Sequence, residues 1–99
     1  MNWVVSNNET SSRFEAQVGS HTAFIEYRRS PEVITFLHSY VPPSLEGYGI
    51  GGQLARAGLV FARSEGLKVI AVCPFVKAYI RRHSGYSDLL KSASPNDIP

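Results

Sequence analysis

The stretch that decides the fold is a glycine cluster, and it reads Glu46-Gly47-Tyr48-Gly49-Ile50-Gly51-Gly52. Four of the eight glycines of the chain fall within it, immediately before an amphipathic segment. The first N–H groups of a helix have no partner within the helix and together carry about half a positive charge. Glycine lets an anion approach these groups without meeting a Cβ. The cluster therefore predicts a pyrophosphate-binding loop, and a purely structural turn is the alternative. No Lys-Ser/Thr pair follows Gly52, so the loop is not a Walker loop.

Downstream of the cluster, the sequence predicts a helix, a strand and a second helix. Apolar residues recur at three- and four-residue spacing over 50–65, and Gly66 is the expected C-terminal cap of that helix. Residues 68–73 are typical of a short strand that is buried on both faces. Pro74 begins a second helix that extends to about Arg82. The strand before the loop and the strand after the first helix should be parallel, as in other crossover connections.

Upstream of the cluster, period-two alternation predicts strands over 13–18 and 21–29, and a third strand follows over 33–41 to complete an antiparallel meander. The third strand is apolar on both faces as far as Leu37, which places it inside the sheet. Residues 7–12 are polar and without periodicity, and we expect a flexible loop there. The fold class is α/β (α+β): an antiparallel meander, a strand-helix-strand crossover and a closing helix. We expect one domain over 1–91 and a flexible tail over 92–99.

Composition limits the functions that the chain can have. Its 99 residues suffice for one modest core, and no apolar run approaches the ~20 residues that a membrane span needs. The single cysteine, Cys73, rules out an internal disulfide or a cysteine-rich zinc site, so we expect a reducing, cytoplasmic location and no metal. The formal charge is −2 over 1–48 and +5 over 49–91. This basic excess suits a small polyanion and is too sparse for a nucleic acid.

Part of the chain resembles a known family. Residues 46–51 resemble the acetyl-CoA pyrophosphate motif Q/R-x-x-G-x-G/A of the GNAT superfamily of N-acetyltransferases, with Glu46 in place of Gln or Arg. A wider pattern resembles very small single-domain GNAT-like acetyltransferases, and it consists of Leu37, Val41-Pro42-Pro43, Gly47, Gly49-Ile50, Leu54, Ala62-Arg63, Gly66-Leu67-Lys68-Val69, Cys73, Tyr79-Ile80, His83 and Tyr86 to Leu89. The resemblance implies a minimal GNAT fold and an acetyl-CoA-dependent N-acetyltransferase that modifies a primary amine of unknown identity. The alternative is a non-catalytic acyl-CoA-binding module, because the Glu46 carboxylate would repel a pyrophosphate and the chain has no acceptor-binding subdomain.

The resemblance also implies where acetyl-CoA would lie. The third and fourth strands would splay apart, so that Ser39, Tyr40 and Val41 offer backbone groups to the pantetheine arm. The pyrophosphate would be held by Glu46, Gly47, Tyr48, Gly49, Ile50, Gly51 and Gly52. Cationic partners for the phosphates would come from the second helix, at Lys77, Arg81 and Arg82.

Three residues are candidates for the chemistry. His38 near the end of the third strand could take the proton of the amine. Alternatively, His38 has only a structural role, with its side chain satisfied by a hydrogen bond. Tyr79 lies where GNAT enzymes commonly place the tyrosine that protonates the coenzyme thiolate. Cys73 is either a small buried hydrophobe or a nucleophile beside His38, activated by the helix that begins at Pro74. Direct attack by the amine is favoured over an acetyl-Cys73 relay, and the oligomeric state stays open.

Overall fold

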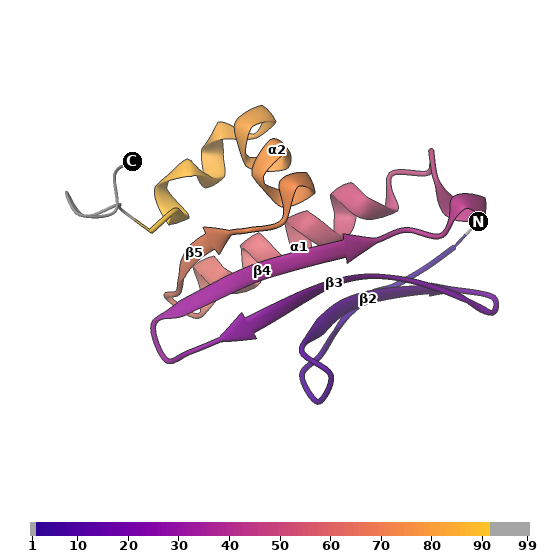
Figure 1. The fold of residues 1–99 in the computed structure, drawn as a ribbon, viewed down its shortest axis with the longest axis horizontal. Helices are drawn as coiled ribbons and strands as arrows, with labels where there is room; N and C mark the ends of the chain where they lie inside the picture. Colours follow the sequence, from indigo (N-terminus) through magenta and orange to yellow (C-terminus); the bar gives the residue numbers. More distant parts are fainter. Residues whose placement is uncertain (1, 92–99) are drawn as a thin grey trace.

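The computed structural model describes residues 2–91, which form a five-stranded sheet with helices on one of its faces (Figure 1). The strands and helices along the chain are β1 (Val5–Asn8), β2 (Arg13–Val18), β3 (His21–Arg29), β4 (Val33–Tyr40), the 3₁₀ turn η1 (Pro43–Leu45), α1 (Ile50–Ser64), β5 (Lys68–Ala71), α2 (Pro74–Arg82) and the 3₁₀ turn η2 (Ser84–Leu89). The sheet order is β1-β2-β3-β4-β5, and only the β4–β5 pair is parallel. The predicted fold class, with its meander, crossover and closing helix, is confirmed. The predicted tail over 92–99 lies outside the described residues.

The sheet has one strand that the sequence analysis missed. Residues 7–12 were expected to form a loop, but Asn7 and Asn8 belong to β1, which pairs with β2 from Val5↔Ala16 to Asn8↔Arg13. Residues 9–12 do form a turn, so the prediction was wrong only for Asn7 and Asn8, whose polar side chains find partners. Asn7 Oδ1 accepts a 2.7 Å hydrogen bond from the Tyr27 hydroxyl, and Asn8 Nδ2 donates to Glu15 Oε1 at 3.2 Å. These bonds form only once β2 and β3 are in place.

The core lies between one face of the sheet and the apolar side of α1. Its members from the strands include Phe14, Ile25, Ile34 and Phe36, and its members from α1 include Ile50, Leu54 and Leu59. The period-two and helical patterns in the sequence select these residues, because each strand and α1 bury a single face.

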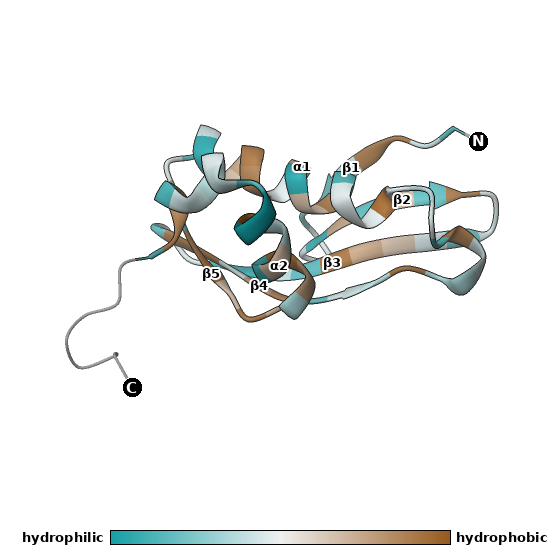
Figure 2. Ribbon diagram, turned by 90° about the horizontal axis from the view of Figure 1, so that it is seen from above, coloured by the Kyte–Doolittle hydropathy of each residue, from teal (hydrophilic) through white to brown (hydrophobic). Residues whose placement is uncertain are grey.

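In the described part of the chain, the other face of the sheet carries no helix. The fourth predicted strand, now β5, is coloured mostly brown for hydrophobic residues in Figure 2, and the sequence analysis took it as buried on both faces. Val69 is buried, but Ile70 is 38% exposed and Val72, just after the strand, is 54% exposed. That expectation was wrong because α1 and α2 cover the same face of β5.

The segment α2–η2 packs alongside α1. Val76 and Ile80 face inward, as predicted. Arg63 near the end of α1 binds the carboxylate of Asp88 in η2 through two hydrogen bonds of 3.0 and 2.9 Å, and it also donates to the Gly85 carbonyl. Within residues 2–91, no helix has the length and apolarity to cross a bilayer.

Candidate functional site

Strands β4 and β5 diverge at a bulge in β4. The register runs Glu26↔His38 and then Tyr27↔Phe36, so Leu37 is an extra residue in β4. On the other side, pairing with β5 ends at Phe36↔Ala71. The amides of Val72 and Cys73 both donate to the Phe36 carbonyl, at 3.0 and 2.9 Å, and the chain then turns into α2. Across residues 2–91, β5 offers no partner to the part of β4 that follows Phe36.

The start of α1 is open toward this divergence. Gly47 and Gly49 have φ values of +87° and +80°, which side chains with a Cβ rarely adopt, and Gly49 is the N-cap residue. The first intrahelical hydrogen bond runs from the Gln53 amide to the Gly49 carbonyl at 3.1 Å. No side chain caps the helix, and no acidic residue lies in its first turn. Among residues 2–91, the amides of residues 50–52 therefore have no protein acceptor, and they are free to bind an anion.

A cavity of about 380 Å³ lies against this helix start. Its lining consists of Ser39, Val41, Leu45, Glu46, Gly47, Gly49, Ile50, Gly51, Gly52 and Phe75. Eight of the ten residues predicted to bind the cofactor thus lie together, whereas Tyr40 and Tyr48 are exposed outside the lining. The sequence analysis missed Leu45 and Phe75. Phe75 follows Pro74 in the first turn of α2, and only the packing of α2 beside α1 brings its ring to Gly51.

Comparison with known proteins agrees with this geometry. Residues 13–89 match the family described as GCN5-related N-acetyltransferases. The chain belongs to this family, and it is an acyltransferase. A solution structure of a GCN5-like protein from Staphylococcus aureus, proposed to be an N-acetyltransferase, has a similar fold, with a TM-score of 0.68 and 28% sequence identity. The similarity covers 93% of this chain and 91% of that one. The family uses acetyl-CoA as its acetyl donor, so the cavity at α1 is the candidate donor site.

The structure separates two of the predicted catalytic residues of this acetyltransferase. The Cys73 thiol is buried on the helix-covered side of the sheet, and its Sγ lies 3.6 Å from Ser39 Oγ. His38 precedes Ser39 in β4, so its side chain points to the uncovered face, where it is 60% exposed. There, His38 Nε2 lies 2.6 Å from Glu26 Oε1. The sequence analysis missed Glu26, because only the register of β3 on β4 places the two residues opposite each other.

Tyr79, the third candidate, lies on α2 beside the start of α1. A Cβ on Gly52 would lie 3.7 Å from the Tyr79 ring, which also stacks on His83 at a centroid distance of 4.0 Å. Burial raises the pKa of Tyr79 above its ordinary value near 10, with a further rise from Tyr86 and a partial opposing effect from Arg56. The phenol therefore keeps its proton at neutral pH.

The three cations predicted for the phosphates lie on two sides of α2. Lys77 and Arg81 line a separate hollow of about 220 Å³ with Ala71, Ile80, Ser87 and Leu90. Since each helical residue turns by about 100°, Lys77 lies almost opposite Phe75 and faces away from the glycine loop. Arg82 follows Phe75 by two helical turns and lies on the side of the candidate donor site. Arg56 of α1, which acts on the Tyr79 pKa, is a further cation near this site that the sequence analysis did not select.

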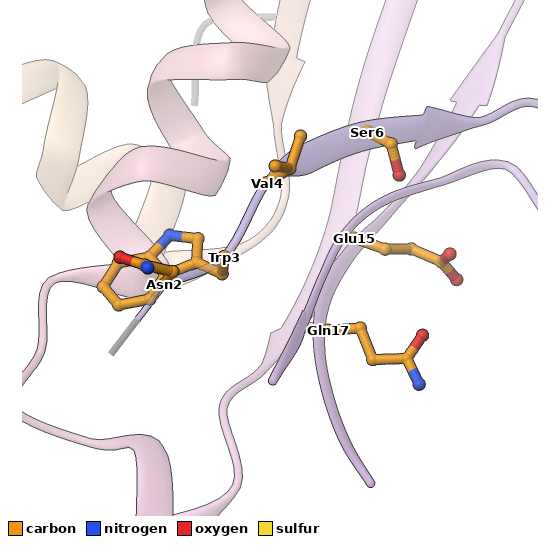
Figure 3. Close-up of a pocket in the computed structure, with 6 residues that line it drawn as sticks. All are labelled: Asn2, Trp3, Val4, Ser6, Glu15 and Gln17. Carbon is orange, nitrogen blue, oxygen red and sulfur yellow. The ribbon is translucent and has the colours of Figure 1, made fainter. Parts of the chain in front are cut away.

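A third hollow, of about 430 Å³, lies at the N-terminal edge of the sheet (Figure 3). It is lined by Asn2, Trp3, Val4, Ser6, Glu15 and Gln17. Figure 3 shows the side chains of Ser6, Glu15 and Gln17 pointing away from those of Asn2 and Trp3. The Trp3 indole is already engaged, because its Nε1 donates to Gln53 Oε1 at 3.0 Å. These side chains do not converge on a common point, and the hollow at α1 remains the candidate site.

Proposed function

We propose that this acetyltransferase transfers an acetyl group from acetyl-CoA to a primary amine, with the donor bound in the cavity at the start of α1. The observation that carries the proposal is the uncapped helix start, which opens into a cavity beside the divergence of β4 and β5. The residues fit a diphosphate: three adjacent amides lack an acceptor among residues 2–91, and a Cβ placed on Gly47 or Gly49 would meet no described atom within 4 Å.

The donor would lie across two elements. The amides of residues 50–52 would bind its pyrophosphate, and the backbone of Ser39, Tyr40 and Val41 would bind the pantetheine arm, because β5 leaves this part of β4 unpaired. Gly51 lets the Phe75 ring pack closely against the start of α1, because a Cβ there would lie 3.0 Å from that ring. Glu46 is exposed, so its carboxylate can turn to solvent while its backbone lines the cavity.

Bound acetyl-CoA supplies an acetyl group that its thioester activates for attack by an amine. His38 would remove a proton from the incoming ammonium, since neutral imidazole is available as a base near pH 7. A backbone N–H near Tyr40 would polarise the thioester carbonyl. Tyr79, protonated and partly buried beside the start of α1, would donate a proton to the departing thiolate. The burial of Cys73 and its distance from the face that carries His38 support direct transfer.

Two measurements on the full chain test the proposal. Isothermal titration should give saturable one-to-one binding of acetyl-CoA, with a Kd in the range of about 1 μM to 1 mM that is usual for enzyme substrates. A thiol-release assay against a panel of primary amines should then give amine-dependent formation of free coenzyme. Absence of binding would contradict the donor site, and binding without turnover on any amine would favour the non-catalytic module.

A further inference from the structure

The uncovered face of the sheet carries a group of side chains directly behind the candidate donor site. We call Phe24, Glu26, His38 and Tyr40 the open-face cluster. The ring of Phe24 has its centroid 6.0 Å from that of His38 and 5.9 Å from that of Tyr40, and Glu26 Oε1 lies 2.6 Å from His38 Nε2. Tyr40 is 49% exposed, and Phe24 and Glu26 are partly buried. The cluster thus presents two aromatic rings, one carboxylate and one imidazole to solvent.

Only the thickness of one strand separates this cluster from the donor cavity. Ser39 lines the cavity, and its two neighbours in β4, His38 and Tyr40, point to the opposite face. Consecutive Cα atoms lie about 3.8 Å apart. On the side facing α2, no strand among residues 2–91 pairs with β4 after Phe36, so an acetyl group held along this edge would have access to both faces.

We propose that the open-face cluster is the acceptor site, and that it binds a primary alkylammonium with no carboxylate close to the amine. The inference rests on the proposed function and deepens it. An ammonium ion is attracted to the faces of Phe and Tyr rings and to the Glu26 carboxylate, whereas an anionic substituent would meet that carboxylate. On the uncovered face, the described residues do not restrict the length of an alkyl chain. An alkyl amine therefore matches both the charge and the shape of the surface.

Three further charged residues face this region. The Arg13 guanidinium lies 4.5 Å from the centroid of the Phe24 ring and forms an ion pair with Glu15, so its charge is matched. Arg28 follows Glu26 by two residues on the same face of β3 and is exposed. The Glu26 carboxylate is consequently the anionic group closest to His38, and it attracts the ammonium to this end of the sheet.

Glu26 acts as a positioning residue for His38. A neutral imidazole that donates from Nε2 to Glu26 keeps the lone pair of Nδ1 free. Nδ1 takes one proton from the ammonium, and the freed amine nitrogen attacks the thioester carbonyl carbon. The N–C bond forms and the C–S bond breaks. The sulfur leaves with the bonding electrons and takes a proton from Tyr79, which regains one from solvent. The second proton of the nitrogen and the proton held by His38 go to solvent. The products are the N-acetylated amine and free coenzyme A.

The test compares two probe amines of similar basicity, butylamine and 4-aminobutanoate, with acetyl-CoA as donor. We expect kcat/KM for butylamine to exceed that for 4-aminobutanoate at least about tenfold. This ratio corresponds to a difference of about 1.4 kcal/mol in activation free energy. Glu26→Gln should lower kcat for butylamine about tenfold or more and reduce the ratio between the probes to below about threefold. Tyr40→Leu should raise KM for butylamine about fivefold while kcat changes less than about twofold. The acetyl-CoA Kd should stay unchanged in Glu26→Gln, because Glu26 lies outside the lining of the donor cavity.

Gln17→Ala is the matched control, because Gln17 is exposed on the same face but outside the cluster, and its kinetics should equal those of the wild type.

If the wild type does not bind acetyl-CoA, the proposed function fails and this inference with it. If the wild type binds acetyl-CoA, three results would overturn the acceptor site alone. They are an equal or reversed preference between the probes, no turnover of either probe, and an unchanged ratio between the probes in Glu26→Gln. Sedimentation equilibrium covers a further outcome: a dimer that Tyr40→Leu dissociates would place a second copy of the chain on this face and also overturn the inference.

Discussion

The thiol of Cys73 faces the hydroxyl of Ser39, with Sγ and Oγ 3.6 Å apart, on the opposite side of the sheet from His38. The thiol is 1% exposed, so neither a base nor solvent reaches it readily. We expect Cys73→Ala to keep kcat within about threefold of the wild type and to lose about 1 kcal/mol of stability, as for removal of one buried heavy atom. Intact-mass spectrometry after incubation with acetyl-CoA should detect no acetyl group on Cys73. A trapped acetyl adduct that Cys73→Ala abolishes would instead establish the relay.

Comparison of Gly49 with Gly19 allows the effect of backbone strain on stability to be measured separately from the effect on acetyl-CoA binding. Gly49 and Gly19 both have positive φ values, +80° and +61°, and a Cβ on either would meet no atom within 4 Å. Gly49→Ala and Gly19→Ala should therefore each lose about 1–2 kcal/mol of stability, the cost of the left-handed conformation for other residues. Only Gly49→Ala should also weaken acetyl-CoA binding, by about tenfold or more, because its methyl group lies at the helix start. Urea denaturation and isothermal titration measure the two effects, and equal acetyl-CoA affinity in both variants would contradict the phosphate site.

The hydroxyl of Tyr79 should matter for catalysis and not for donor binding. Burial raises its pKa above the ordinary value near 10, so the phenol is protonated and available as an acid throughout the neutral range. Tyr79→Phe should lower kcat about a hundredfold, as for loss of a general acid, with an unchanged acetyl-CoA Kd. Tyr86→Phe is the matched control, since the Tyr86 ring lies 6.3 Å from that of Tyr79 and the substitution keeps it. Equal rates for the wild type and Tyr79→Phe would rule out the proton donor.

Gly58 of α1 lies directly against the ring of Phe36. A Cβ at this position would lie 2.7 Å from Phe36 Cε1, a distance that forces the buried ring or the helix to move. Gly58→Ala should therefore destabilise the protein by about 1–3 kcal/mol, despite the higher helix propensity of alanine. At Gly52 a Cβ would make an ordinary 3.7 Å contact with Tyr79, so Gly52→Ala should be neutral or stabilising by up to about 1 kcal/mol. Chemical denaturation of both variants gives the two free energies of unfolding, and a stabilised Gly58→Ala would disprove the close packing.

The Arg63–Asp88 contact makes the free energy of unfolding depend on pH in the acid range. Hydrogen bonding by Arg63 lowers the pKa of Asp88 below its ordinary value near 3.8. The carboxylate then binds its proton less readily in the folded chain, so its contribution is present at pH values above the unfolded pKa and is lost as pH falls through the folded pKa. Asp88→Asn should lower Tm slightly at pH 7, and the difference from the wild type should shrink at a pH well below the ordinary pKa of 3.8. Thermal unfolding at both pH values is the measurement, and a difference that persists at low pH would contradict the assignment.

Local pattern predicted most of the fold. The bounds of β2, β3, α1 and α2 agree with the predicted ranges to within about one residue. Strands and helices with one buried face can be predicted from the periodicity of their apolar residues, since burial of that face is the main contribution to their stability. The two errors have a common origin. The polar strand β1 and the exposed side of β5 depend on which neighbours cover them, and a single sequence segment carries no information about its neighbours.

For the candidate site, the sequence by itself determined the open glycine loop at the start of α1, because unpaired amides and glycines at a helix start are local properties of 46–52. Tertiary structure alone decided the rest. The bulge at Leu37 and the departure of β5 after Phe36 put Ser39 on one face of the sheet and His38 on the other, and the register of β3 placed Glu26 against His38. Packing of α2 beside α1 brought Phe75 to Gly51. These contacts join residues that lie far apart in the chain, so only the packing of the complete core determines them.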